Sequence, residues 1–540
     1  MHPKLFSQVL IRNGRNGSLS LSLSLSLSRF YYTNRSNKAT LYSRISPLGD
    51  PGTSVVPELD EWVQKGNRVR VGELQRIIHD LRKRKRFSQA LEMVDFDQKL
   101  ANDSGIISGQ QWNLPIIFCF VNALLLQISE WMNKKGVCIF SPTEHAVQLD
   151  LIGRVHGFSS AESYFNNLKE QDKTEKTYGA LLNCYVRQRQ TDKSLSHLQK
   201  MKEIGFASSP LTYNDIMCLY VNLGQHEKVP DVLAEMKENK VSPDNFSYRI
   251  CMNSYGVRSD LEGMEKVLKE MESQPHIVMD WNTYTVAANI YIKTGLTDKA
   301  TNALKKSEER LDKKDATAYN QLISLHASLG NKEEVLRLWD LQKSACKRCI
   351  NKDYIITLDS LVRLGELEEA QKVLDEWQSS ENCYDFRVPN SLIVGYAEKG
   401  QCEKAETLLG NLMEKGRMTT PNSWGIVAAK YLEKDETQKA LDCIKSALSL
   451  CPGKVWKPNP RVTARILSWL GDKGSVEEVE AFVDSLRTVV PVNRHMYHSL
   501  LKAHIRDGRA INALLDGMKA EKIDEDEETK NILAMRQNSA

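Results

Sequence analysis

Few residues of this 540-residue sequence have the type and spacing that could carry out chemistry. Cys346 and Cys349 stand two residues apart, but a structural zinc site needs a second pair or two suitably spaced histidines, and none follows. Three histidines in a helix-like run lack the glutamate of an HExxH zinc motif, so surface or capping roles are expected. They are His495, His498 and His504. The acidic run Asp524–Glu528 is typical of a solvated tail. We therefore predict no metal, no cofactor and no catalytic centre.

Basic residues are concentrated in two places, which bounds the kind of partner the chain can hold. The first 49 residues contain seven Lys or Arg and no Asp or Glu, so with a net charge of +4 for the whole chain the remainder carries about −3. A nearly neutral body is not a general polyanion binder, and any nucleic acid must be held by a local basic strip. The densest strip is a candidate phosphate contact, with a solvated turn as the alternative. It consists of Arg82, Lys83, Arg84, Lys85 and Arg86.

Residues 1–49 have the composition of a disordered organellar transit peptide: basic, rich in Ser and free of acids. The early arginines Arg12, Arg15 and Arg29 favour a mitochondrial destination, the matrix, over a plastid. Apolar residues are too interrupted for a membrane span, so no membrane association is expected.

After residue 140 the sequence consists of a repeat of about 35 residues, and this repeat must position any functional side chain. One ladder of tyrosines recurs at intervals of 35 or 36 residues, and further ladders of aromatic, glycine and small residues follow in phase. The first ladder is Tyr178, Tyr213, Tyr248, Tyr284, Tyr319 and Tyr354. Within a unit, Tyr213, Ile216, Met217 and Tyr220 fall on one helical face, and Gly224 ends that helix.

A second helix completes each unit, and a hairpin this short buries its apolar faces only by stacking on its neighbours. The sequence therefore predicts an all-α protein: an α-solenoid superhelix of about 10 to 12 antiparallel helical hairpins. The array should span residues 141–528, with a C-terminal tail at 529–540. The tyrosines are expected to be core residues and not a platform for stacking bases.

The first hairpin is interrupted. Residues 50–140 contain an N-terminal helical segment and one repeat, and removal of residues 94–127 restores a continuous apolar helix face and a 36-residue unit. Two interpretations stay open for residues 94–127. They are a translated, retained intron, or a genuine loop insertion.

The segment "PLTYNDIMCLYVNLGQHEKVPDVLAEMKENKVSPD" (Pro210–Asp244) resembles a pentatricopeptide repeat. Tetratricopeptide repeats share the hairpin plan but differ in the Trp, Gly and Pro pattern. The opening "GELQRIIHDLRKRKRFSQALE" is similar to a plant mitochondrial subgroup of the P class. The resemblance implies binding of single-stranded RNA, one nucleotide per repeat. The fifth residue of each unit would face the inner groove and meet a base together with the closing residue.

The resemblance assigns candidate site residues one by one. Asn214 with Asp244 matches the family's uracil-preferring pair, and Thr285 with Asp315 matches its guanine-preferring pair. The other code-like residues depart from the family pattern. They are Arg249, Asp280, Asn320 and Asn390. At the second position of three units stand cations expected either to contact phosphates or to be ordinary solvated charges. They are Lys176, Lys352 and Arg387.

The predicted function is a non-catalytic RNA-binding protein of mitochondrial RNA metabolism, acting on the stability, processing or translation of an organellar transcript. Two alternatives stay open. One is a scaffold subunit of the mitochondrial ribosome, and the other is a solenoid that binds only proteins. The target transcript and the oligomeric state are left open by the sequence.

Overall fold

The computed structural model describes residues 56–65, 140–379, 385–415, 419–450 and 456–537, with the single residues 41, 126 and 130. The chain divides into two compact units, one of residues 1–85 with 127–138 and the other of residues 86–126 with 139–540. Helix α4 (Val56–Gln64) belongs to the first unit. The predicted transit peptide, the basic strip and the interrupted first repeat lie almost wholly outside the described residues, so the interpretations placed there stay predictions.

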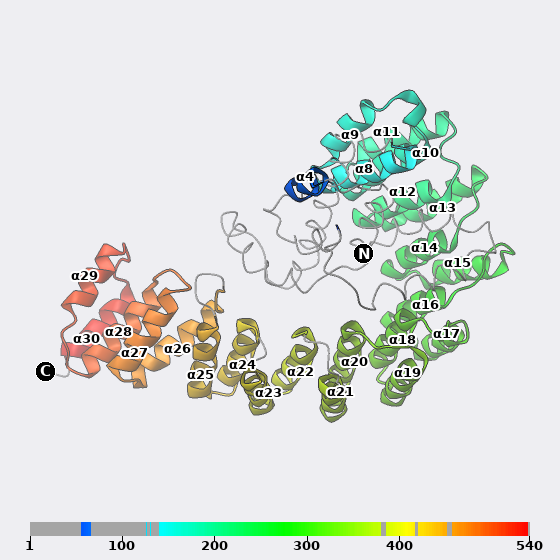
Figure 1. Cartoon of the computed structure of the whole chain (residues 1–540). Helices are drawn as coiled ribbons and strands as arrows, with labels where there is room; N and C mark the ends of the chain where they lie inside the picture. Colours follow the sequence, from blue (N-terminus) through cyan, green and yellow to red (C-terminus); the bar gives the residue numbers. More distant parts are fainter. Residues whose placement is uncertain are drawn as a thin grey trace. The chain divides into compact units, whose positions relative to one another are not determined.

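The second unit is a row of helical hairpins, which confirms the predicted all-α solenoid (Figure 1). In chain order the two helices of each hairpin are α8 (Pro142–Val155) and α9 (Phe158–Asn166), α10 (Glu175–Arg187) and α11 (Thr191–Glu203), α12 (Pro210–Asn222) and α13 (Val229–Glu238), α14 (Asn245–Val257) and α15 (Leu261–Ser273), α16 (Trp281–Lys293) and α17 (Thr297–Glu309), α18 (Ala316–Ser328) and α19 (Lys332–Ala345), α20 (Asn351–Leu364) and α21 (Leu367–Ser379), α22 (Arg387–Glu398) and α23 (Cys402–Glu414), α24 (Pro421–Glu433) and α25 (Thr437–Ser449), α26 (Pro460–Lys473) and α27 (Val476–Arg487), and α28 (Arg494–Arg506) and α29 (Asn512–Ala520). Two short 3₁₀ helices, η3 (Glu170–Asp172) and η4 (His226–Lys228), and a last helix, α30 (Glu527–Gln537), complete the described part of this unit.

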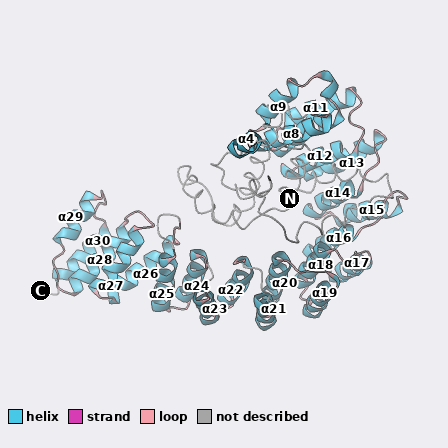
Figure 2. Cartoon of the chain, in the orientation of Figure 1, coloured by secondary structure: helices cyan, strands magenta, loops and turns pink. Residues whose placement is uncertain are grey.

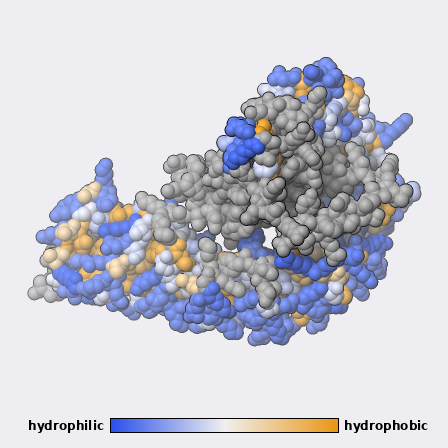
Figure 3. All heavy atoms as spheres, viewed as in Figure 1, coloured by the Kyte–Doolittle hydropathy of each residue, from blue (hydrophilic) through white to orange (hydrophobic). Residues whose placement is uncertain are grey.

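Each hairpin consists of a first helix and a second helix with different neighbours. First helices pack on the first helices of the hairpins before and after them, whereas second helices make few contacts with each other. Between α12 and α23, Figure 1 shows the first helices along the inner side of the row and the second helices along its outer side. Figure 2 shows that the described residues form helices joined by loops, and Figure 3 shows this outer side covered mainly by hydrophilic residues.

The local sequence explains how one hairpin forms. On α12 the side chains of Tyr213, Ile216 and Met217 are buried, as the helical spacing predicts. Gly224 follows with φ at +75°, a left-handed conformation that a residue without a Cβ adopts at little cost and that ends the helix. Pro243 closes the unit in the loop before α14, where its missing N–H interrupts no helix.

The first tyrosine ladder lies in the core, as predicted, with Tyr354 half-buried and its other five members buried. In the second aromatic ladder, the hydroxyl of Tyr291 joins two successive hairpins. Tyr291 on α16 donates to Glu265 on α15 at 3.1 Å, and Lys299 on α17 contacts the same carboxylate at 2.6 Å. The ammonium of Lys299 also lies 5.7 Å from the centre of the Tyr291 ring. The buried ring therefore supplies packing, while its polar edge fixes two second helices on either side of one first helix.

The C-terminal boundary predicted from the sequence is wrong, because α30 continues the array where a tail was expected from residue 529. Ile532 on α30 is buried in one apolar cluster with Leu501 of α28 and Ile511. The acidic run before it is not a free tail either, since Asp526 accepts hydrogen bonds from the backbone N–H and the hydroxyl of Thr529 and so begins the helix. The segment has the character of a tail in the sequence because it is short and mostly polar. Its buried residue, Ile532, nevertheless packs as a residue of a first helix does.

Replacement of Ile532 by Ala should therefore loosen the last hairpin. Truncation of a buried isoleucine side chain costs on the order of 2 kcal/mol or more, because it removes apolar packing and leaves a cavity. Hydrogen exchange of α28 and α30 should accelerate. The exposed Asn531→Ala change on the same helix is the matched control and should leave exchange unaltered. Equal exchange in the two variants would contradict the packing of α30 on α28.

No helix among the described residues combines the length and the apolar character that a bilayer crossing requires.

Candidate nucleic-acid interface

The fifth residues of three hairpins are buried between first helices. Asn214, Thr285 and Asn320 are 2%, 4% and 4% exposed. The expectation that these three side chains face an open groove is therefore wrong in this structure. First helices pack directly on each other at the fifth position, and a polar group buried there needs a hydrogen-bond partner within the protein.

The partner is supplied by the next hairpin in five places, and we call each such contact a fifth-position latch. In a latch, the fifth side chain of one hairpin bonds to the residue that precedes the next first helix or to the third residue of that helix. The five latches are Asn214–Asp244, Arg249–Asp280, Asn320–Asp353, Asn390–Ser423 and His498–Thr529.

Two latches involve the predicted closing residue. The side-chain amide of Asn214 donates to Asp244 at 3.2 Å, and the guanidinium of Arg249 contacts Asp280 at 2.7 Å. Both aspartates also cap the following helix, where Asp280 accepts from the backbone N–H of Thr283 at 2.9 Å. Burial alone would raise the pKa of Asp280, but Arg249 and the bonds from Thr283 outweigh it, and that pKa lies below its ordinary value. The sequence therefore paired these residues correctly, although the pairs serve the contact between hairpins.

Other latches reach the third residue of the next first helix. The amide of Asn320 donates to Asp353 at 2.7 Å, and its oxygen accepts from Gln342 at 3.2 Å, with all three side chains buried. In the latch of Asn390 the direction is reversed, and the hydroxyl of Ser423 donates to the amide oxygen of Asn390 at 2.6 Å. Asp353 and Ser423 were not predicted from the sequence.

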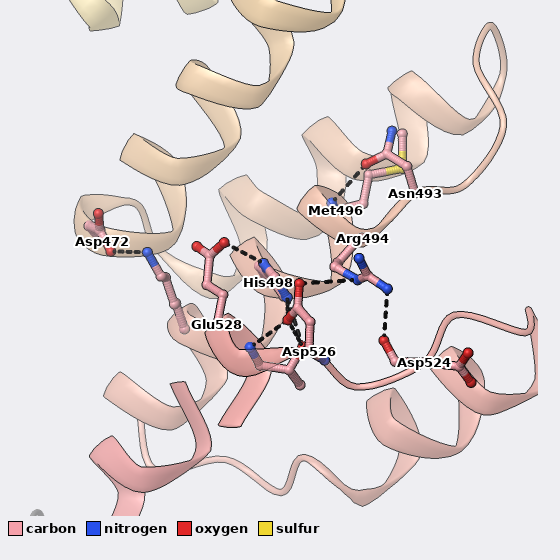
Figure 4. Close-up of polar contacts among 10 residues, drawn as sticks. Asp472, Asn493, Arg494, Met496, His498, Asp524, Asp526 and Glu528 are labelled. Carbon is pink, nitrogen blue, oxygen red and sulfur yellow. Dashed lines mark hydrogen bonds and ion pairs between the residues drawn. The ribbon is translucent and has the colours of Figure 1, made fainter. Parts of the chain in front are cut away.

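The last latch is built on a histidine that the sequence suggested for the surface (Figure 4). His498 is buried, and its Nε2 lies 2.9 Å from the hydroxyl of Thr529 and 3.4 Å from Asp526, while Nδ1 lies 3.4 Å from Glu528. Burial lowers the pKa of His498, and the two carboxylates only partly oppose that shift. Arg494 completes the cluster by contacting Asp526 at 3.4 Å.

One predicted pair is not joined. The hydroxyl of Thr285 donates to the backbone oxygen of Asn282 at 2.8 Å. Asp315 accepts from the backbone N–H groups of Thr317 and Ala318 and caps α18. Thr285 and Asp315 each have a local partner, so neither needs the other.

Comparison with known proteins identifies the repeat. Residues 208–256 match the PPR repeat family, and residues 176–206, 246–275, 317–341, 354–381 and 388–417 each match the PPR repeat. Over 511 residues the chain is 56% identical to pentatricopeptide repeat-containing protein At4g21705, mitochondrial, of Arabidopsis thaliana, an alignment that covers 94% of this chain and 97% of that protein. This chain belongs to the pentatricopeptide repeat family.

Other relatives from the same plant extend the comparison. Pentatricopeptide repeat-containing protein At2g20710, mitochondrial, is 35% identical over 440 residues, which are 81% of this chain and 82% of that protein. The large ribosomal subunit protein mL101 (rPPR4) is 32% identical over 411 residues, which are 76% of this chain and 84% of that protein.

Among solved structures, the pentatricopeptide repeat protein PPR10 in complex with an 18-nt psaJ RNA element is similar, with a TM-score of 0.44 and 20% identity. The comparison covers 75% of this chain and 60% of that chain, so this protein spans less than two thirds of PPR10.

In this pentatricopeptide repeat protein, the predicted phosphate contacts of the second position differ from one another. Lys176 is exposed and donates to the hydroxyl of Thr143 at 2.8 Å, whereas Arg387 binds the carboxylate of Asp385 through its Nε and Nη2 atoms. That ion pair raises the pKa of Arg387 and offsets its charge. Lys352 is exposed and has no ion pair with the described residues, so it keeps its full charge for a ligand.

The cysteines and histidines of this pentatricopeptide repeat protein are not gathered into a metal cluster anywhere in its described part. Cys346 and Cys349 are half-buried and unlinked, and burial raises the pKa of each thiol, that of Cys349 to about 11. His504 contacts Glu480 at 3.0 Å.

Proposed function

We propose that this protein is a non-catalytic RNA-binding protein of mitochondrial RNA metabolism, which holds single-stranded RNA along its array of hairpins. The observation that carries the proposal is the family membership over most of the chain. PPR10, another member, was solved with an RNA element, and the two most similar relatives named above are mitochondrial by name. Occupation of a single strand would block nucleases or prevent base pairing without any catalytic group, and so affect transcript stability, processing or translation.

The burial of fifth residues between first helices restricts how the protein could recognise the bases of such an RNA. Uracil recognition by Asn214 and guanine recognition by Thr285 would require first helices to separate, because both side chains are buried. For each base read by a residue in a latch, the latch must break, and this costs free energy because a buried polar group loses its partner. We infer that contacts to the RNA backbone supply most of the affinity and that readout of bases is confined to few units.

A second candidate is a structural subunit of the mitochondrial ribosome. The likeness to the large ribosomal subunit protein mL101, which the chain matches over 84% of that protein's length, favours it. Ribosomal RNA is recognised largely by shape and backbone, for which buried fifth residues are no obstacle.

Crosslinking in intact mitochondria, followed by sequencing of the recovered RNA, tests the main proposal. A short footprint on one or a few transcripts is the expected result. Recovery of no RNA above a mock control would overturn it and favour a solenoid that binds only proteins.

Sedimentation of mitochondrial extract through a sucrose gradient separates the two candidates. A free transcript-binding protein should leave the ribosomal fractions when salt is raised moderately, because its contacts with RNA are electrostatic. Stable comigration with the large subunit at that salt concentration would support the ribosomal candidate instead.

A further inference from the structure

Two adjacent closing loops, by which we mean the loops that join one hairpin to the next, carry several exposed positive charges. The loop between α17 and α18 contains Lys313 and Lys314, and the loop between α19 and α20 contains Lys347 and Arg348. Lys352 follows as the second residue of α20. The closing loops of the three preceding hairpins, residues 204–209, 239–244 and 274–280, together contain a single lysine, Lys240. These two loops are therefore more basic than the three loops before them.

We name these five residues the basic edge, and the structure places their loops side by side. The thiol of Cys346 lies 3.8 Å from the backbone oxygen of Lys314, so the two loops are in contact. Lys313, Lys314, Lys347, Arg348 and Lys352 are all exposed. The four lysines of the set make no ion pair with the described residues.

The carboxylates of the same loops are engaged with the protein. Asp312 accepts from the backbone N–H of Lys314 at 3.0 Å, and Asp315 caps α18. Asp353 is buried, where it accepts from Asn320 and from the backbone N–H of Ile350. The acids therefore face inward or hold backbone groups, while the lysines face solvent.

Helix direction adds to the potential at this edge. Helices α18 and α20 both begin directly after the two loops, so their N-terminal ends lie beside the lysines. The partial positive charge at a helix N-terminus favours anions at the same place. In the adjoining unit the fifth residue, Asn320, is buried in its latch and presents no free group to a base.

We propose that the basic edge binds the phosphate backbone of single-stranded RNA and anchors it independently of base sequence. The proposal rests on the proposed function and adds where, and through which chemistry, the RNA is held. Lysine is suited to this task because it acts as a point charge toward phosphate and reads no base edge.

Fluorescence anisotropy with the full chain tests the assignment, with two labelled 20-nucleotide single strands of unrelated sequence as probes. Replacing all four lysines by Ala (Lys313→Ala, Lys314→Ala, Lys347→Ala, Lys352→Ala) should weaken binding of both probes by about tenfold or more near 0.1 M KCl. The dependence of log K on log[KCl] should become shallower by about 0.7 for each phosphate that the variant no longer neutralises.

A matched variant removes the same charge from the outer side. Lys266→Ala, Lys269→Ala, Lys305→Ala and Lys445→Ala change four exposed lysines of second helices that have no ion pair with described residues. This variant should bind within about twofold of the wild type, since its charges lie away from the closing loops. Circular dichroism should show the wild-type helix content in both variants.

The outcomes separate the two proposals. If the wild type binds RNA and the basic-edge variant binds equally well, or no more weakly than the matched variant, the basic edge is not the anchor. Selective weakening of one probe would also overturn the proposal, because removal of a phosphate contact weakens all sequences alike. If the wild type binds neither probe even at 50 mM KCl, the proposed RNA-binding function itself fails.

Discussion

The Asp215→Asn variant should be more stable than the wild type at pH 8 and about equally stable at pH 4. Asp215 lies on α12, fully buried, and accepts a hydrogen bond from the amide of Asn183 on α10 at 3.0 Å. Burial raises the pKa of this carboxyl to about 7, although the bond from Asn183 and the charge of Arg187 oppose the shift. An asparagine of the same shape keeps an oxygen for Asn183 and cannot ionise.

The sign follows from proton binding in the two states. An unfolded aspartate titrates near pH 4, so between about pH 4 and pH 7 the folded chain holds a proton that the unfolded chain has released. The free energy of unfolding therefore falls as the pH rises through that window, and above it the buried charge imposes its full cost. A shift from 3.8 to about 7, at roughly 1.4 kcal/mol per pKa unit, sets that cost at up to about 4 kcal/mol.

Urea unfolding followed by circular dichroism, together with hydrogen exchange of α10 and α12, would measure the effect at pH 4, 6 and 8. Exchange is informative here because distant hairpins of an array can unfold separately. Asp516→Asn, at an exposed carboxyl of α29, is the control and should show no such dependence on pH. A variant that is less stable than the wild type at pH 8 would contradict the prediction, because it would show that Asn183 and Arg187 stabilise the ionised carboxylate by more than burial destabilises it.

The repeat could be predicted from the sequence because it shows directly as a regular spacing of residue types along the chain. Tyr213 and Tyr248 are 35 residues apart because each fills the same place in successive hairpins, and apolar spacing alone reveals that. The latches, in contrast, depend on the distance between one first helix and the next. The residue spacing within a single hairpin does not determine that distance. Asn320 was therefore expected in an open groove, whereas it is buried between helices.

A local sequence pattern could have located part of the site. A capping side chain stands three residues before a Ser or Thr at several unit boundaries, for example Asp244 with Ser247 and Thr420 with Ser423. Asp526 and Thr529 repeat the same spacing. The pattern would have placed a helix start inside the acidic run and corrected the predicted tail, because Asp or Thr at that spacing satisfies the free N–H groups of a helix.

The Asn320→Asp variant should destabilise the array by roughly 3 kcal/mol or more, because it leaves two buried carboxylates in contact. In the wild type the Asn320 amide lies 2.7 Å from Asp353, and both side chains are buried. With aspartate at residue 320, either both groups stay charged and repel each other, or one binds a proton at a cost in free energy. Urea unfolding and hydrogen exchange of α18 and α20 would measure the destabilisation.

A compensating change distinguishes a latch from a base-reading residue. In the double variant Asn320→Asp with Asp353→Asn, the new amide at 353 can donate to the new carboxylate at 320, which still accepts from Gln342. The double variant should therefore recover at least half of the stability that the single change removes, since donor and acceptor are only exchanged. A group that stood in an open groove and read a base would behave differently. Its replacement by Asp would leave unfolding unchanged and alter the preferred RNA sequence, and Asp353→Asn would rescue neither property.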